Sequence, residues 1–169
     1  MKASGISTLA LMILGVLATA LPVCTSWPVR LIYNPTDSAP RGWYRVTPVD
    51  RVVVDDYVIA RLPEDVALLA TSRGYLPATV PLLKRVAAAS GAVVCSHSGV
   101  ISIDGRSAAR AMRSDRAGRA LPSWSGCRVL AQDEVFLLST HPSSFDSRYF
   151  GPLHVRSING TALPLWIWR

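Results

Sequence analysis

Two residues of this 169-residue chain, Ser38 and Lys84, have side chains suited to nucleophilic catalysis. A serine hydroxyl is a weak nucleophile at neutral pH, so a neighbouring base must take its proton during attack. A lysine can be that base only when it is neutral, and burial among apolar side chains favours the neutral form. Lys84 lies in the apolar segment PLLKRVAAA, and Lys2 is the only other lysine among 18 Lys and Arg residues. Because arginine does not release its proton, we predict Ser38 as nucleophile and Lys84 as general base.

Ser38 lies in a segment of turn-forming residues, NPTDSAPR at positions 34–41. Apolar segments at 29–33 and 43–46 flank it, so we expect a loop between two strands. Each residue of the pair also has a structural explanation: serines are common in turns, and a lysine at a strand edge can extend into solvent.

A third segment, PSSFDSRYFG at positions 142–151, combines an acid, a base, hydroxyls and aromatic rings. Asp146 and Arg148 could form a buried ion pair that fixes a loop, and Ser144 could hold a neighbouring polar group. A turn with a surface salt bridge explains the same composition.

The three segments, in this order behind one apolar segment, resemble the type I signal peptidase family. They resemble more closely its conjugative-transfer branch, the TraF-like peptidases that process pilin precursors. The resemblance covers nearly the whole chain. Residues 34–42 are similar to the nucleophile segment, residues 83–86 to the general-base segment and residues 144–151 to the final motif.

The resemblance implies a role for each of the matching residues. Ser38 is the nucleophile and Lys84 the base, and the Thr36 hydroxyl joins the Ser38 backbone N–H in the oxyanion hole. The supporting residues are Ser144, which hydrogen-bonds the lysine amine, and Asp146 and Arg148, which hold the loop. No cofactor and no metal are expected.

Ala39 follows the nucleophile where general signal peptidases usually have methionine. This departure favours the conjugative branch over a general signal peptidase. Members of that branch cleave a pilin precursor and in some cases join its new carboxyl end to its own amino terminus. The expected partners are therefore a precursor protein, membrane lipid and other proteins of a conjugation apparatus. Hydrolysis and cyclisation both remain open.

The apolar segment from Ile6 to Val23 carries no charge. Its 18 residues would span about 27 Å as a helix, against a bilayer core of roughly 30 Å. We predict an N-terminal transmembrane helix, although Ala18-Thr19-Ala20 also has the form of a signal-peptide cleavage site. We therefore divide the chain into residues 1–26, an anchor or signal segment, and residues 27–169, a peptidase domain. The domain is expected on the periplasmic side of a bacterial inner membrane.

Cys95 and Cys127 are expected to pair in that oxidising compartment. The alternative is a zinc site with Cys95, His97, Cys127 and His141. Its cysteines lack the close spacing typical of structural zinc sites.

The rest of the sequence predicts a mainly β domain, a signal-peptidase-like antiparallel sheet with one short helix. Residues 51–62 are rich in β-branched residues, with a bulge or turn at Asp55 and Asp56. Pro63-Glu64-Asp65 is typical of a helix start, and Gly74 of its end. Further strands are expected at 82–88, 92–95, 100–103 and 135–139, with a turn at Asp104-Gly105 and a polar excursion from 106 to 126.

Two other functions compete with the Ser/Lys dyad. A Ser38/His141/Asp146 triad is one, because triads occur in many chain orders. A non-catalytic basic subunit of an envelope secretion or conjugation assembly is the other, because the net charge is +7. The basic residues are scattered and never exceed runs of two, so nucleic-acid binding is not expected.

Overall fold

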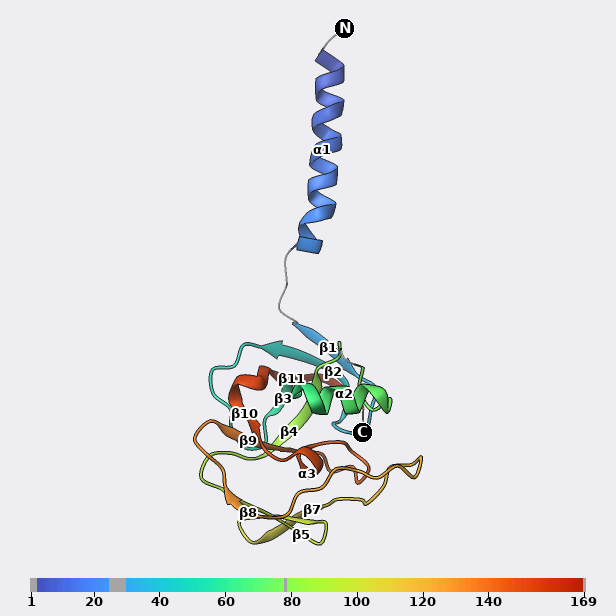
Figure 1. Ribbon diagram of the computed structural model, residues 1–169. Coiled ribbons are helices and arrows are strands. Elements are labelled where there is room, and N and C mark those ends of the chain that lie inside the picture. The colour runs from blue at the N-terminus through green and yellow to red at the C-terminus, as the bar shows by residue number, and fades with distance from the viewer. Residues whose placement is uncertain (1–2, 25–29, 78, 169) are drawn as a thin grey trace.

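The structure, a computed structural model, describes residues 3–24, 30–77 and 79–168. Within them the chain forms a seven-stranded and a four-stranded sheet, whose strand pairs are all antiparallel, with three α-helices (Figure 1). The strands are β1 (Leu31–Asn34), β2 (Arg41–Thr47), β3 (Tyr57–Ala60), β4 (Leu82–Ala88), β5 (Val93–His97), β6 (Val100–Ile103), β7 (Arg106–Arg110), β8 (Gly126–Val129), β9 (Glu134–Leu138), β10 (Leu153–His154) and β11 (Ile158–Trp168). The helices are α1 (Ala3–Cys24), α2 (Glu64–Ser72) and α3 (Ser147–Phe150), and Val155–Ser157 forms a 3-10 turn. The prediction of a mainly β, antiparallel domain is confirmed; it contains the one short helix predicted, α2, and a second short helix, α3, that was not predicted.

The seven-stranded sheet has the order β1-β2-β11-β3-β4-β9-β10. Successive residues of a strand point to opposite faces, so β3 and β4 contribute to two separate cores. Val58 and Val86 pack on one face in a buried cluster with residues of β9, whereas Ile59 and Leu83 pack on the other with Ala39. Lys84 pairs with Val58 across the two strands.

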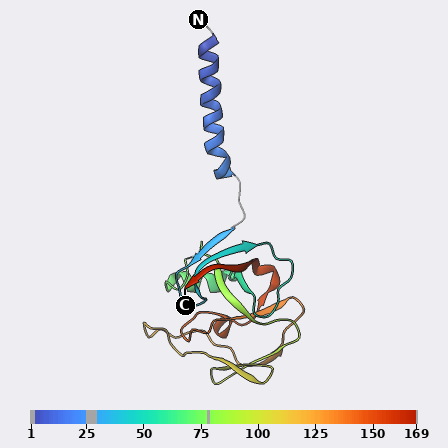
Figure 2. The same ribbon diagram turned by 180° about the vertical axis from the view of Figure 1, so that it is seen from behind.

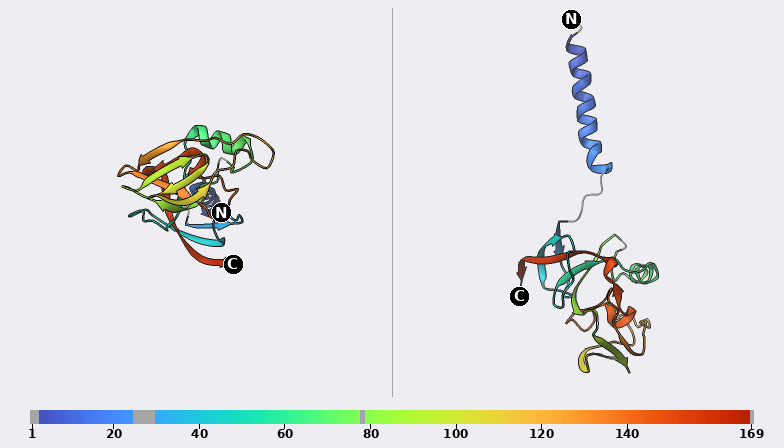
Figure 3. Two further views of the ribbon diagram at one scale, coloured as in Figure 1. Left: turned by 90° about the horizontal axis from the view of Figure 1, so that it is seen from below. Right: turned by 90° about the vertical axis from the view of Figure 1, so that its left-hand side faces the viewer.

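The four-stranded sheet, in the order β7-β6-β5-β8, lies at the far end of the domain from α1 (Figure 1; Figure 3, left). Cys95 and Cys127 are directly opposite each other on β5 and β8 and form the expected disulfide. Asp104 and Gly105 both have positive φ, 48° and 76°, and make the expected tight turn between β6 and β7. The polar excursion begins with a strand, β7, that the sequence did not indicate.

Helix α2 begins at Glu64 after Pro63 and ends at Ser72. Glu64 and Asp65 occupy its first turn, where the helix dipole favours acids. Gly74 follows with φ +70°, and its N–H donates to the carbonyl of Thr71 at 3.0 Å. This agrees with the predicted bounds to within one residue at each end.

Helix α1 extends away from both sheets (Figures 1 and 2). Side chains at positions 7–18 are exposed. Within the described residues no helix has the length and apolar character needed to cross a membrane, so the predicted transmembrane helix is not confirmed. The division predicted between residues 26 and 27, and Val29 of the first expected strand, lie outside the described residues.

Strand β11 is the longest strand and passes between β2 and β3 before it continues beside β2 alone. Its last residues reach the side of the domain opposite α2 (Figure 3, right). Gly42 permits this close approach, because a Cβ at Gly42 would overlap the backbone oxygen of Trp166. The φ of +143° at Gly42 is also one that other residues rarely adopt.

Candidate active site

The predicted nucleophile lies in the loop between β1 and β2, and Asn34 organises this loop. Asn34 is the last residue of β1 and is only 6% exposed. Its amide nitrogen donates to the carbonyl oxygens of Thr36 and Ala39, each at 2.9 Å, and of Pro40 at 3.2 Å. Its amide oxygen accepts from the backbone N–H of Thr36 at 3.2 Å. The buried side chain therefore binds both ends of the turn that carries Ser38.

The hydroxyls of Thr36 and Ser38 lie 2.9 Å apart. Thr36 Oγ1 also lies 2.9 Å from the amide oxygen of Asn34, to which it donates. Thr36 is thus next to the nucleophile, where an oxyanion donor would have to be. Among the described residues, Ser38 Oγ makes no hydrogen bond to Lys84.

Lys84 is buried on β4, with a relative exposure of 3%. Burial lowers the pKa of its ammonium group from 10.5 to about 8. The negative charge of Asp146 raises this pKa and the positive charge of Arg148 lowers it, so the two charges of one ion pair oppose each other at Lys84. Desolvation is the largest influence, as the apolar segment around Lys84 predicts.

Asp146 and Arg148 form a buried ion pair with relative exposures of 0% and 2%. The guanidinium donates to both carboxylate oxygens, at 2.7 and 2.9 Å. The pair also binds the end of β9, because Asp146 accepts from the Ser139 N–H at 2.9 Å and Arg148 donates to the Ser139 carbonyl at 2.7 Å. Arg148 donates further to the Pro142 carbonyl at 3.1 Å. These contacts fix the loop between β9 and α3.

Ser144 lies in this loop and is buried, but its hydroxyl has no hydrogen-bond partner in the described part of the chain. The hydrogen bond expected between Ser144 and the lysine amine is therefore not formed. A buried hydroxyl without a partner costs free energy. The Ser144 hydroxyl is thus free to donate or accept a hydrogen bond. It lies in the same loop as Asp146, whose ion pair with Arg148 shifts the pKa of Lys84.

Ser38 opens into a cavity of about 760 Å³. Its walls come from the nucleophile loop, from β3 and β4, from the end of β9 and from the end of β11. The lining residues are Asp37, Ser38, Ala39, Pro40, Arg41, Tyr57, Arg85, Leu138, Ser139, Thr140, Ile167 and Trp168. The nucleophile is therefore accessible, whereas Lys84 is enclosed.

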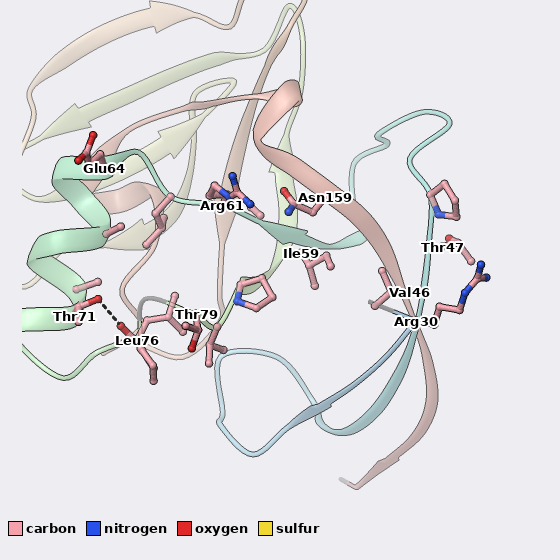
Figure 4. A pocket seen from close by; sticks show the side chains of 18 residues that line it. Arg30, Val46, Thr47, Ile59, Arg61, Glu64, Thr71, Leu76, Thr79 and Asn159 are labelled. Atoms are coloured by element: carbon pink, nitrogen blue, oxygen red, sulfur yellow. Dashed lines mark hydrogen bonds between the residues drawn. The ribbon is translucent and has the colours of Figure 1, made fainter. Parts of the chain in front are cut away.

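A larger cavity, of about 1060 Å³, lies between α2, the segment before β4 and the strands β2, β3 and β11 (Figure 4). Ile59 and Val46 form part of its floor, and Thr71 of α2 donates to the Leu76 carbonyl at 3.2 Å on the opposite wall. Ile59 also packs against Ala39, the neighbour of Ser38. Ile59 therefore contributes both to this cavity and to the cluster that contains the neighbour of Ser38.

The contacts of His141 do not make a triad. Its Nδ1 pairs with Ser143 Oγ at 3.1 Å, and in the described residues it has no hydrogen bond to Ser38 or Asp146. The carboxylate of Asp146 is bound instead by Arg148 and by the Ser139 N–H.

The alternative zinc site loses two of its four expected ligands to the disulfide. Both cysteines are consumed in the Cys95–Cys127 bond, and His97 Nε2 lies 3.5 Å from Cys127 Sγ. His141 is not part of the Cys95, His97 and Cys127 group.

The residues missed from the sequence are Asn34, Ile167 and Trp168. Asn34 could have been found, because an asparagine at the start of a turn commonly hydrogen-bonds the backbone that follows it. Ile167 and Trp168 are more than 120 positions from Ser38 in the sequence, and only the pairing of β11 with β2 brings them to the same cavity.

Comparison with known proteins identifies the class. A family model described as signal peptidase, peptidase S26, matches residues 4–168, and the chain belongs to this family. Its curated relatives are named as conjugal or plasmid transfer proteins. A "probable conjugal transfer protein TraF" of Sinorhizobium fredii (strain NBRC 101917 / NGR234) is 35% identical, covering 94% of this chain and 85% of the relative. A "conjugal transfer protein TraF" of Agrobacterium tumefaciens (strain 15955) is 34% identical over 79% and 80% of the two chains. A "plasmid transfer protein TraF" of Escherichia coli is 32% identical over 80% and 82%.

Among solved structures, a signal peptidase I from Enterococcus faecalis V583 aligns with 67% of this chain and 97% of its own. The sequence identity is 17% and the TM-score is 0.39. A TM-score this low does not establish a shared fold.

Proposed function

We propose that this chain is a serine endopeptidase of the signal peptidase type that processes a precursor protein in conjugal transfer, a conjugative pilin. Ser38 forms the acyl-enzyme and Lys84 is the general base. The observation that carries the proposal is the nearly complete burial of Lys84, a lone lysine in the folded part of an S26 family member. Burial of that kind keeps a lysine neutral enough to accept a proton.

The reaction begins when Lys84 Nζ takes the proton of Ser38 and Ser38 Oγ bonds to the scissile carbonyl carbon. The electron pair of the carbonyl moves onto its oxygen, which accepts hydrogen bonds from the Ser38 N–H and the Thr36 hydroxyl. The C–N bond then breaks, and the Lys84 ammonium returns its proton to the departing amine. An ester between Ser38 and the substrate remains.

Water or an amine resolves the ester. Water, deprotonated by Lys84, releases the cleaved chain, whereas attack by the substrate's own amino terminus forms a new peptide bond and a ring. Both routes restore the Ser38 hydroxyl. Asp146 and Arg148 keep the loop beside Lys84 in place, and Ser144 is available to hydrogen-bond the amine once Lys84 shifts toward Ser38. Hydrogen bonds at active sites often tighten only when substrate binds, so the lack of a Ser38–Lys84 bond is compatible with this cycle.

The cavity at Ser38 and the larger cavity beside α2 suit an extended substrate chain. Ala39 lines the first cavity and Ile59 the second, and both residues belong to one buried cluster. We assign to the substrate an extended conformation along the two cavities, with small apolar residues near the cleaved bond.

We place the catalytic domain, residues 27–169, on the periplasmic side of the bacterial inner membrane. The Cys95–Cys127 disulfide supports an oxidising compartment. Residues 1–26 are assigned to delivery of the chain to that membrane, as an anchor or as a signal removed afterwards.

The test uses the purified full chain and a candidate pilin precursor, with products identified by mass spectrometry. Ser38→Ala and Lys84→Ala are expected to abolish cleavage, and His141→Ala to retain it as the matched control. Retained cleavage in the Lys84 variant would exclude the dyad. If Ser38→Ala left processing intact while loss of exposed arginines abolished complex formation, the chain would be a non-catalytic basic subunit. A product lighter by one water than the linear chain would show cyclisation.

A further inference from the structure

The side-chain amide of Asn34 has only one orientation that satisfies its surroundings. The three backbone oxygens near one end of the amide can only accept hydrogen bonds, and the Thr36 N–H near the other end can only donate. The nitrogen must therefore face the carbonyls, and the oxygen must face Thr36.

This orientation determines the direction of the hydroxyl protons. The Asn34 amide oxygen carries no proton, so the 2.9 Å contact with Thr36 Oγ1 must use the single hydroxyl proton of Thr36. Thr36 then has no proton left for Ser38, and the second 2.9 Å contact must use the proton of Ser38. Ser38 therefore donates to Thr36, which donates to Asn34.

From this directed chain we infer that Asn34 is a positioning residue that acts on the reaction through the Thr36 hydroxyl, an inference that rests on the proposed function. In the free protein Asn34 holds the Thr36 hydroxyl beside Ser38, with the acceptor side of Thr36 toward the nucleophile. During attack the Ser38 proton goes to Lys84 Nζ, and the Thr36 O–H turns from the Asn34 oxygen to the oxyanion.

The exchange leaves no buried group of Asn34 without a partner. The amide oxygen keeps the hydrogen bond from the Thr36 backbone N–H, and the amide nitrogen keeps its carbonyl acceptors. The Thr36 hydroxyl can therefore turn while the turn itself stays fixed. A donor held in place before the reaction stabilises the oxyanion without reorganisation of the loop.

The chain offers a matched control for the structural part of this role. Tyr44 Oη donates to the Pro40 carbonyl at 2.6 Å, so it also binds the nucleophile loop but has no contact with the Thr36 hydroxyl. Tyr44→Phe removes one loop hydrogen bond and keeps the ring that fills the core. This variant separates loss of loop support from loss of the hydroxyl's position.

The experiment is a double-mutant cycle on kcat and KM with the purified full chain and a cleavable precursor peptide. Thr36→Val is expected to lower kcat by about 10²- to 10³-fold, as for loss of one oxyanion donor, and Thr36→Ser to restore most of it. Asn34→Ala is expected to lower kcat at least about tenfold with KM changed less than about threefold. In the Thr36→Val background, Asn34→Ala is expected to lower kcat by less than about threefold, because the hydroxyl on which Asn34 acts is absent.

Several outcomes would overturn the inference. One is an Asn34→Ala loss that is equally large with and without the Thr36 hydroxyl. Another is a Tyr44→Phe loss as large as that of Asn34→Ala, since this would make loop support the whole effect. If Asn34→Ala does not fold, wild-type kcat in Thr36→Val would still refute the role of the hydroxyl. Failure of the proposed function would appear separately, as cleavage by Ser38→Ala.

Discussion

A change of pH tests the state of Lys84 in the free enzyme. Because only neutral Lys84 accepts the Ser38 proton, kcat/KM is expected to rise about tenfold per pH unit below pH 8 and to level off above it. At pH 7 a lysine with a pKa of about 8 is neutral in about one-tenth of the molecules. At its ordinary pKa of 10.5 it would be neutral in about 0.03% of them. Burial therefore increases the competent fraction by about 300-fold at neutral pH.

The assay measures kcat/KM from pH 6 to 10 with the full chain and a peptide substrate that has no titratable group near the cleaved bond. His141→Ala should leave the rise unchanged, because the His141 side chain pairs with Ser143 and forms no hydrogen bond with Lys84 in the described part of the chain. A profile that is level between pH 6 and 8 would contradict a base with a pKa of about 8. A rise that disappears in His141→Ala would instead indicate a histidine base.

The lowered pKa also means that Lys84 reduces the free energy of unfolding at neutral pH. Its folded pKa, about 8, is below the 10.5 of the unfolded chain, so between these values the unfolded state binds more protons and stability rises with pH. Below pH 8 the full cost is present, about 3 kcal/mol. Lys84→Met is therefore expected to raise the free energy of unfolding at pH 7 by up to about 3 kcal/mol while it abolishes activity. Urea unfolding measures this gain, and a loss of stability in the variant would contradict it.

The remaining predictions concern stability, each measured by denaturant or thermal unfolding. Asp146→Ala is expected to lower the free energy of unfolding by about 3–5 kcal/mol, because it leaves Arg148 buried and unpaired. The double change Asp146→Leu with Arg148→Met should recover most of this stability. Equal losses of stability in both variants would argue against a buried charge as the cause. Replacement of Cys95 and Cys127 by alanine is expected to lower the free energy of unfolding by about 3–4 kcal/mol, since the disulfide closes a 32-residue interval. The value of kcat should stay near wild type, because the disulfide lies in the four-stranded sheet. A large fall in kcat in protein that remains folded would contradict this. Gly42→Ala is expected to lower the melting temperature by several degrees or to prevent folding, because the new Cβ would overlap the backbone of β11. An unchanged melting temperature would show that β2 and β11 can separate at this position.

Strands in which apolar and polar residues alternate, or in which apolar residues form a continuous run, could be predicted from the sequence. The bounds of β4 and β6 are those expected, and β9 is shifted by one residue. Strand β7 was missed because RSAAR has little apolar character, and most of its side chains are exposed. Strand β11 was missed because it contains Asn-Gly and Pro164, which normally argue against a central strand. Thr161 is the last β11 residue that pairs with β3, so Pro164 lies where the strand has one free edge.

The candidate site was predictable in its residues more than in its contacts. The apolar segment around Lys84 indicated its burial, and the acid and base of the final motif indicated the buried pair. The lack of a hydrogen-bond partner for the Ser144 hydroxyl among the described residues could not be predicted, because a hydrogen bond depends on distances that sequence order does not contain. The same holds for the Asn34 amide, which binds backbone groups that any sequence would provide.

The most direct test of the Ser38/Lys84 dyad is mass spectrometry of a pilin precursor incubated with the wild-type chain, Ser38→Ala or Lys84→Ala, each shown to be folded. The proposed mechanism predicts one cleavage position with the wild type and intact precursor with both variants. Cleavage at that position by either variant would contradict the dyad.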